Sequence, residues 1–163
     1  MPSLLILDTG GTFNKRYDPI DGTLYVEKTS QALHHIVEKW LTAFEIRAII
    51  GKDSLDMTTQ DRLEIMMHLH HSDHQAAIVV HGTDTMHVTA EYIAQSELDI
   101  PIVLTGAMVP YSIDPVEATA NFASAVGFLR SNPQAGVYIA MHGHVAPWEQ
   151  LTKDKQAGLF VKT

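Results

Sequence analysis

The stretch LLILDTGGT, residues 4–12, joins a short apolar run to a polar, glycine-rich turn. Similar runs of about five residues, rich in β-branched side chains, recur at Ile46–Ile50, Ala76–Val80, Ile100–Leu104 and Val137–Met141. Strands that are buried on both faces of a parallel sheet show this near-continuous hydrophobicity. The chain is therefore predicted to form a parallel sheet whose first strand is Leu4–Leu7.

Segments long enough for helices separate these runs. In residues 30–44, apolar side chains recur at spacings of three and four, as on a helix with one buried face. Thr58 and Asp61 resemble a capping box, which predicts the start of a second helix. The apolar positions of this helix are expected to be Leu63, Met66, Met67 and Leu69.

The second half of the chain continues the alternation. A helical segment follows Asp84, and a further helix is predicted from Asp114-Pro115 to about Arg130. An N-cap carboxylate followed by proline at the first helical position favours helix initiation there. The order βαβαβαβαβ predicts an α/β fold, an open and mostly parallel sheet with helices on both faces.

Length and composition exclude several classes of protein. The 163 residues match one globular domain, with 45% apolar and 18% charged residues and a net charge of -8. The acidic balance argues against nucleic-acid binding, and no apolar run reaches the ~20 residues that span a membrane. The lack of cysteine excludes disulfides and thiolate nucleophiles. No signal-peptide pattern opens the chain, so a cytoplasmic protein is expected.

Ligands of open α/β sheets bind at the carboxyl ends of the strands. The predicted strands end in turns that combine glycine with hydroxyl or imidazole side chains: Thr9–Thr12, Asp53-Ser54, His81–Asp84, Thr105–Ala107 and His142–His144. Glycine permits close approach to a ligand, and hydroxyls supply nucleophiles or donors. Residues 13–29 are long for a connection and are predicted to form an active-site lid.

The turns do not fit nucleotide binding, because GGTFNK fails the G-x-G-x-x-G pattern and no P-loop pattern occurs. A threonine nucleophile, Thr12 or Thr83, is an alternative. Lys153 or Tyr17 is chemically able to assist it, and Asp84 is able to orient the lysine. On spacing alone, turn hydroxyls and helix caps are the commoner role for such threonines and for Asp84.

Ordered motifs along almost the whole chain resemble the bacterial-type L-asparaginase/glutaminase family. Thr9–Thr12 and His81–Met86 resemble its two signature motifs. Asp53–Met57 resembles its substrate-carboxylate loop, and Thr105–Met108 its fourth strand-end loop. The resemblance implies the fold of the family's N-terminal domain and amide hydrolysis through an acyl-enzyme.

The resemblance also implies a role for each matching residue. Thr12 is expected to be the nucleophile, Thr83 the second catalytic threonine and Asp84 its neighbour, with Lys153 completing a Thr-Lys-Asp group. Ser54 is expected to hold the substrate α-carboxylate. The full set of expected substrate-binding residues is Gly11, Ser54, Gly82, Thr83, Asp84 and Ala107, the last through its carbonyl.

A lid tyrosine that contacts the nucleophile is expected to be Tyr17 rather than Tyr25, because shorter members of the family carry tyrosine soon after the first motif. Leu55 departs from the family, in which glutamine commonly follows the serine, and is expected to weaken binding or alter specificity. Members of about twice this length carry a C-terminal domain. We therefore expect residues 1–163 to be a single-domain form without it.

Four histidines cluster near the end of the second predicted helix: His68, His70, His71 and His74. His70 and His74 have the spacing of a helical metal pair, but no HExxH context accompanies them. Cationic side chains near a helix C-terminus also interact favourably with its dipole. We interpret these histidines as surface residues and expect no metal site.

The predicted function is hydrolysis of L-asparagine to L-aspartate and ammonia, without metal or organic cofactor. One alternative is the same chemistry on another small amide, namely L-glutamine, D-asparagine or a cyclic amide. Another is a non-catalytic amino-acid-binding module. The expected partners are a small amide amino acid and further copies of the chain in a homodimer or larger assembly, with neither nucleic acid nor membrane.

Overall fold

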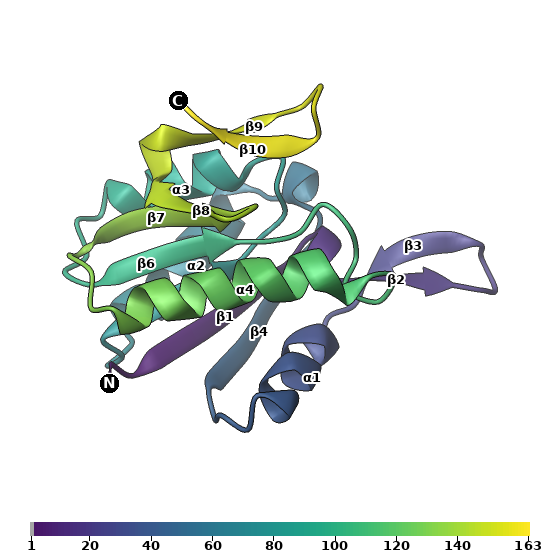
Figure 1. Cartoon of the computed structure of the whole chain (residues 1–163), viewed down its shortest axis with the longest axis horizontal. Coiled ribbons are helices and arrows are strands. Elements are labelled where there is room, and N and C mark those ends of the chain that lie inside the picture. The colour runs from purple at the N-terminus through teal and green to yellow at the C-terminus, as the bar shows by residue number, and fades with distance from the viewer. Residues whose placement is uncertain (1) are drawn as a thin grey trace.

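The computed structural model describes residues 2–163, which fold around a six-stranded sheet of order β4-β1-β5-β6-β7-β8 (Figure 1). The strands are β1 (Leu4–Gly10), β4 (Glu45–Lys52), β5 (Ala76–Val80), β6 (Pro101–Thr105), β7 (Gly136–Met141) and β8 (His144–Pro147). The first five are parallel, and β8 pairs antiparallel with β7. The predicted mostly parallel α/β fold is confirmed.

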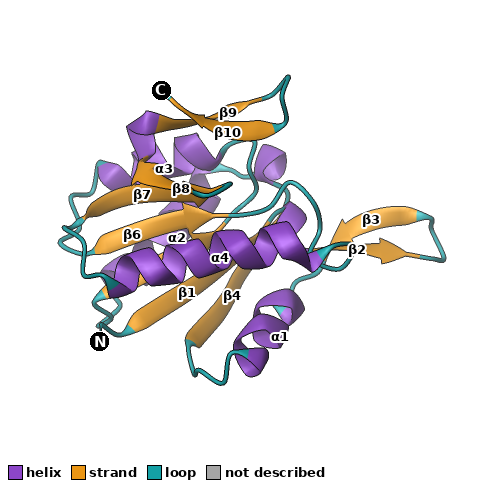
Figure 2. Cartoon of the chain, in the orientation of Figure 1, coloured by secondary structure: helices purple, strands orange, loops and turns teal. Residues whose placement is uncertain are grey.

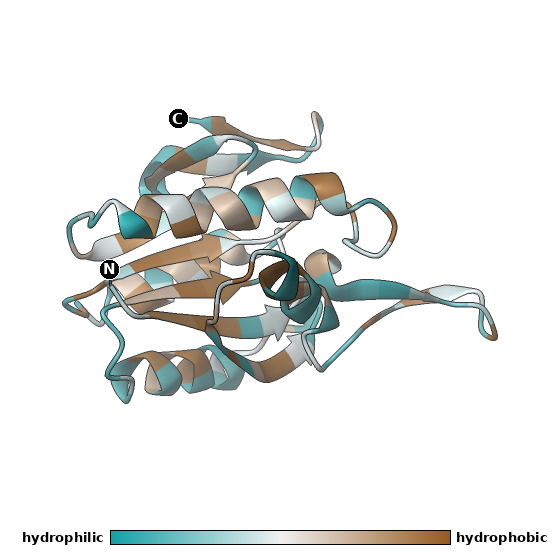
Figure 3. Cartoon of the chain, turned by 60° about the horizontal axis from the view of Figure 1, so that its bottom comes forward, coloured by the Kyte–Doolittle hydropathy of each residue, from teal (hydrophilic) through white to brown (hydrophobic). Residues whose placement is uncertain are grey.

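Helices cover both faces of this sheet (Figure 2). They are α1 (Gln31–Lys39), α2 (Thr59–His70), α3 (Met86–Ala94) and α4 (Pro115–Arg130). Alternate residues of β1 enter different cores: Leu4 and Ile6 pack with side chains of α1 and α4, whereas Leu5 and Leu7 pack with those of α2 and α3. The hydrophobic strands therefore lie between two helical layers (Figure 3).

The predicted helix starts are confirmed by their caps. Thr58 Oγ1 accepts a hydrogen bond from the Asp61 N–H at 3.2 Å, and Asp61 accepts one from the Thr58 N–H at 2.8 Å. Asp114 accepts from the Val116 N–H at 3.1 Å. The first helix is shorter than predicted and ends at Lys39, since Leu41 takes a left-handed conformation with φ 54°.

The predicted buried face of α2 is partly wrong. Leu69 is buried, but Leu63 and Met67 are 41% and 51% exposed. The buried face instead carries Ile65 and Arg62, which is 8% exposed. Arg62 is accommodated there because its guanidinium donates to the hydroxyl groups of Thr89 in α3 and of Thr85 just before that helix.

The predicted lid segment forms a hairpin, which the sequence pattern did not indicate. Strands β2 (Lys15–Asp18) and β3 (Thr23–Val26) pair antiparallel and project from the end of the molecule where the parallel strands end (Figure 1). A second hairpin, β9 (Leu151–Asp154) and β10 (Leu159–Lys162), follows β8. Over residues 2–163, no helix combines the length and the apolar character needed to cross a membrane.

The cap of α2 provides a test of the fold. Replacing Thr58 by Ala removes the side-chain acceptor of the capping box and should lower the free energy of unfolding by about 1 kcal/mol. Chemical denaturation measures this change. Thr59→Ala is the matched control, because Thr59 is the exposed first residue of the same helix and should change stability much less. Equal losses in the two variants would contradict the assignment of the cap.

Candidate active site

The turns after β1, β5 and β4 meet backbone to backbone. A Cβ atom on Gly11 would lie 2.5 Å from Gly82 Cα, and one on Gly82 would lie 2.6 Å from Ser54 Cβ. Real Cβ atoms do not approach so closely, so these positions require glycine. The contact places Thr12, Thr83 and Ser54 together at the carboxyl edge of the sheet.

Thr83, Asp84 and Lys153 form one hydrogen-bonded group. Lys153 Nζ donates to Thr83 Oγ1 and to Asp84 Oδ1, each at 2.8 Å. The Thr83 hydroxyl proton points elsewhere, to Met108 Sδ at 3.5 Å, which is a weak acceptor. A proton held by so weak a partner is readily redirected to a stronger acceptor.

The hairpin that carries Lys153 is fastened to the body of the protein. Phe160 of β10 is 3% exposed, and its N–H donates to His142 Nδ1 at 3.1 Å. Because Nδ1 accepts this bond, the proton of a neutral His142 resides on Nε2, which lies 2.6 Å from Glu117 Oε2. His142 therefore links the Lys153 hairpin to the first turn of α4.

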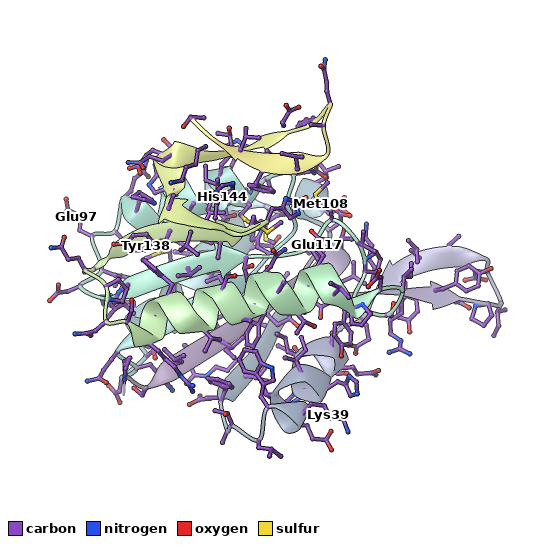
Figure 4. All side chains as sticks on the ribbon, viewed as in Figure 1. Lys39, Glu97, Met108, Glu117, Tyr138 and His144 are labelled. Carbon is purple, nitrogen blue, oxygen red and sulfur yellow. The ribbon has the colours of Figure 1, made fainter. Side chains whose placement is uncertain are left out.

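Glu117 also fixes the loop that follows β6. Its carboxylate accepts hydrogen bonds from the N–H groups of Met108 and Val109 at 2.9–3.0 Å. Met108 and Glu117 lie side by side near the start of α4 (Figure 4). Asn121, one turn further along α4, donates to the Gly106 carbonyl at 2.9 Å. The helix thus holds the segment that contains Ala107.

A buried hydrogen-bond chain supports the Gly82 turn. Burial lowers the pKa of His81 to about 4, so the imidazole is neutral at pH 7. His81 lies 2.7 Å from both the Gly82 carbonyl and Thr89 Oγ1 through its two ring nitrogens. Arg62 Nε donates to Thr89 Oγ1 at 2.9 Å. Since Nδ1 must donate to the carbonyl, Nε2 accepts from Thr89.

Arg62 is also linked, through Thr85, to Ser54, the serine expected to bind the substrate carboxylate. Its Nη2 donates to Thr85 Oγ1 at 3.1 Å, and Thr85 Oγ1 donates to the Ser54 carbonyl at 2.9 Å. The Thr85 N–H donates to Ser54 Oγ at 3.2 Å. This bond leaves the Ser54 hydroxyl proton available as a donor. Arg62 and Thr85 were not predicted from the sequence, although a polar residue interrupting the apolar stripe of α2 was a usable signal.

The two candidate lid tyrosines lie on opposite faces of the β2–β3 hairpin. Tyr17 pairs with Leu24, and Tyr25 pairs with Arg16. Successive residues of a strand point to opposite faces, and directly paired residues share a face. Only one of the two tyrosines can therefore face the Thr12 turn.

The face of Tyr17 also carries Lys15, whose Nζ lies 2.7 Å from Asp53 Oδ2, next to Ser54. The opposite face carries Arg16, which donates to Gln31 of α1. Tyr17 thus lies on the side of the hairpin that leads to the strand ends. Its side chain is 60% exposed, and in the part of the chain that the structure describes it makes no hydrogen bond to Thr12.

Thr12 begins a short 3-10 helix, Thr12–Asn14, and its hydroxyl has no hydrogen-bond partner among residues 2–163. Asp8 lies at the base of this turn and is 2% exposed. It accepts from the Gly10 N–H at 3.1 Å, Asn14 Nδ2 at 2.8 Å and Ser30 Oγ at 2.6 Å. Burial raises the pKa of Asp8 to about 6.

The remaining expected residues take different positions. Ala107 is 1% exposed beside Met108, whereas Leu55 is 71% exposed and points to solvent. The structure therefore brings together most of the expected set: Gly11, Thr12, Ser54, Gly82, Thr83, Asp84, Lys153 and the Ala107 loop. Tyr17 stands apart on the hairpin. Within residues 2–163, no three histidine, aspartate or glutamate side chains gather as metal ligands.

Comparison with known proteins assigns this chain to a family. The family model described as asparaginase, N-terminal, matches residues 3–159. The chain belongs to the asparaginase family. The resemblance seen in its sequence motifs is thereby confirmed.

The chain is also similar to longer proteins that carry a different name. A glutamyl-tRNA(Gln) amidotransferase subunit from Methanococcus vannielii is 30% identical over 154 residues, which are 89% of this chain and 35% of that relative. The protein of the same name from Pyrococcus furiosus is 31% identical over 156 residues, or 90% and 35% of the two chains. The chain thus spans about a third of the length of these curated relatives.

Solved asparaginase structures share the fold. The thermostable L-asparaginase from Thermococcus kodakarensis has a TM-score of 0.85 at 23% identity, covering 98% of this chain and 51% of that one. A probable cytoplasmic L-asparaginase from Campylobacter jejuni has a TM-score of 0.78 at 22% identity, with coverages of 99% and 52%. The predicted N-terminal-domain fold of the family is confirmed.

The contact between the glycine turns can be tested. Gly82→Ala places a methyl group against the backbone and side chain of Ser54 and should destabilise the protein by about 1–3 kcal/mol. Gly127→Ala is the matched control, because nothing lies within 4 Å of its added Cβ on α4 and alanine is the better helix former. The control should stabilise the protein. A Gly82→Ala variant as stable as the wild type would show that the turns do not pack as described.

The buried Asp8 predicts a pH-dependent stability. Its raised pKa means that the folded state binds more protons than the unfolded state between about pH 4 and 6. This contribution to stability is therefore lost as the pH rises through that window, by about 3 kcal/mol in total for a shift from 3.8 to about 6. The free energy of unfolding of Asp8→Asn, relative to that of the wild type, should therefore rise between pH 4 and pH 7, as chemical denaturation at the two pH values would show. A constant difference would contradict it.

Proposed function

We propose that this member of the asparaginase family hydrolyses the side-chain amide of L-asparagine, giving L-aspartate and ammonia through Thr12. The observation that carries the proposal is the Lys153 ammonium held 2.8 Å from both Thr83 and Asp84. The contact of Gly11 with Gly82 sets this group beside the Thr12 turn. A hydroxyl nucleophile needs such an adjacent acid–base group for activation.

In the proposed first step, Thr12 Oγ1 bonds to the amide carbon while its proton moves to the leaving nitrogen, which departs as ammonia. Water then cleaves the resulting ester, restoring the Thr12 hydroxyl and giving the side-chain carboxylic acid of aspartate, which ionises by giving its proton to the released ammonia. The Thr83 hydroxyl, positioned by Lys153, is proposed to relay the protons. The hydroxyl of Thr83 suits this role because its proton contacts only a thioether in the resting site.

The developing oxyanion needs preorganised donors, each worth about 3–4 kcal/mol. The Gly11 N–H is already bonded to the Lys52 carbonyl at 2.9 Å, so we assign it no direct part in this task. The N–H groups of Thr12 and Thr83 are the better candidates, because neither has a hydrogen-bond partner within residues 2–163. Gly11 and Gly82 would then act by bringing these two amides together.

Substrate binding is proposed to use the same edge of the sheet. Ser54 offers its hydroxyl proton to the α-carboxylate, Asp84 offers its carboxylate to the ammonium group, and the Ala107 carbonyl faces the amide. The hairpin in residues 13–29 is proposed to close as a lid that brings Tyr17 to Thr12. Asp84 retains 34% exposure of its side chain, which leaves it accessible to a ligand.

A second candidate is ammonia production for a partner protein. The relatives from Methanococcus vannielii and Pyrococcus furiosus are both named as subunits of an amidotransferase. The same site would then release ammonia from an amide such as L-glutamine, L-asparagine or D-asparagine. The exposed Leu55 offers no polar contact that would select among these amides.

We further propose that the chain forms a homodimer or larger assembly. We propose a cytoplasmic location, as described for the Campylobacter protein.

Ammonia release from L-asparagine, L-glutamine and D-asparagine tests the proposal. Thr12→Val and Lys153→Met should each lower kcat/KM by about 10³-fold or more, because nucleophile and activating group act as a unit. Thr152→Val is the control, since Thr152 is exposed beside Lys153 on β9. Turnover that survives Thr12→Val would exclude Thr12 as nucleophile. Saturable binding without ammonia would favour an amino-acid-binding module.

A further inference from the structure

Both side chains that contact the Thr83 hydroxyl are held by one carboxylate, that of Glu117. Thr83 Oγ1 accepts from Lys153 Nζ at 2.8 Å and donates to Met108 Sδ at 3.5 Å. Met108 is held directly, because its N–H donates to both oxygens of Glu117 at 2.9–3.0 Å. Lys153 is held indirectly, because His142 lies 2.6 Å from Glu117 Oε2 and also accepts a backbone hydrogen bond from the Lys153 hairpin. Glu117 is therefore connected to the Thr83 hydroxyl from two sides.

The hydrogen bond to His142 comes from the strand residue that pairs with Lys153. Phe160 of β10 lies directly opposite Lys153 of β9, and directly opposed residues share a face of a hairpin. The Phe160 N–H donates to His142 Nδ1 at 3.1 Å, and the two rings meet edge to face with centroids 5.9 Å apart. Apolar packing by the buried Leu151 and Phe160 also holds the hairpin, but such packing is not directional. The bond to His142 therefore supplies a directional contact that orients the hairpin independently of Lys153.

His142 is in turn held by α4 at two points. Its N–H donates to Asn121 Oδ1 at 3.0 Å, and its ring meets Glu117 one turn earlier on the same helix. The backbone of His142 has φ 52°, a left-handed conformation that is uncommon outside glycine. Backbone strain of this kind persists where the surrounding contacts enforce it, and it is concentrated at functional sites. The imidazole is therefore aimed at Phe160 by contacts to one helix.

We propose that Glu117 and His142 are positioning residues that align Lys153 with the Thr83 hydroxyl for the proposed proton relay. This role rests on the proposed function, because the two residues hold the proposed acid–base group in place. Positioning matters here because a displacement of about 1 Å at a catalytic group can cost about 100-fold in rate. Glu117 and His142 act through other residues, and neither is assigned a contact with the substrate.

The Glu117 carboxylate suits this role because the three groups bonded to it are all donors. They are the N–H groups of Met108 and Val109 and Nε2 of a neutral His142. An ionised carboxylate accepts on both oxygens, so it satisfies all three and keeps the ring proton on Nε2. An amide of the same shape cannot do so, because its nitrogen is itself a donor. In Glu117→Gln the backbone N–H groups should keep the oxygen, so that the His142 proton moves to Nδ1 and the Phe160 N–H loses its acceptor.

The proton of His142 can be located by NMR of the ring nitrogens, without an enzymatic assay. Ring nitrogens with and without a proton have separate signals, and His142→Asn identifies the pair that belongs to His142 among the ten histidines. In the wild type the proton should reside on Nε2. Glu117→Gln should move it to Nδ1 and speed hydrogen exchange of the Phe160 amide about five-fold. Glu91→Gln is the matched control, because Glu91 is exposed on α3, and it should change neither signal.

Kinetics test the consequence for catalysis. If the protein releases ammonia, Glu117→Gln and His142→Leu should each lower kcat about ten-fold, because Lys153 is misplaced. KM should change little, because Ser54, the proposed contact of the substrate carboxylate, is held by other residues. His34→Leu is the control, because His34 is an exposed histidine of α1, and it should leave kcat unchanged.

His142→Asn separates positioning from a general structural defect. Its side-chain oxygen takes the place of Nδ1 and still accepts from the Phe160 N–H, so kcat should recover part of the loss seen with His142→Leu. This pair of variants also decides the matter if Glu117→Gln does not fold. A wild-type proton on Nδ1, a Phe160 amide that is unaffected in folded Glu117→Gln, or wild-type kcat in His142→Leu would overturn the proposal.

The two sets of measurements separate this role from the proposed function. If no amide is turned over by the wild type, the proposed function fails. The NMR signals and the exchange of the Phe160 amide still decide whether Glu117 controls the hairpin contact through His142.

Discussion

The backbone contact between the turns after β1, β5 and β4 is the constraint on which the rest of the site depends. Gly11, Gly82 and Ser54 approach more closely than any Cβ on the two glycines would allow. Parallel strands deliver their carboxyl ends to one edge, but they do not by themselves bring the following residues within reach of one another. The absence of a side chain on Gly11 and Gly82 allows this approach, which brings Thr12, Thr83 and Ser54 together.

The strands and helix starts were predictable because they depend on local signals. The hydrophobic runs, the capping box at Thr58 and the Asp114-Pro115 start each act within a few residues. The glycine-hydroxyl turns at the strand ends and the family motifs also indicated where a site would form. The hairpin strands β2, β3, β9 and β10 lack a comparable pattern, because they are short and partly exposed, so the lid was predicted only as a long connection.

The supporting residues were not predictable, because their roles depend on tertiary contacts. Arg62 shares the buried face of α2 with Leu69 and Ile65, since Thr85 and Thr89 satisfy its guanidinium. Asp8 looked like the end of a strand, and only the fold brings Ser30 against it. Lys153 is 70 residues from Thr83. The family resemblance identified Lys153, whereas Asp8 and Arg62 needed the structure.

Two kinds of polar network, one buried and one partly exposed, have different roles at this edge of the sheet. In the first, buried hydrogen bonds around the neutral His81 fix the backbone of the Gly82 turn in one arrangement, because each buried donor requires a particular acceptor. In the second, Lys153 and Asp84 are partly exposed charges, and the strength of their ion pair responds to solvent and to a bound ligand. A rigid network around His81 and a responsive ion pair at Lys153 and Asp84 suit a site that must hold a nucleophile in place while protons move. The buried Asp8 departs from this division, since it is an ionisable group whose carboxylate is held among buried hydrogen-bond donors.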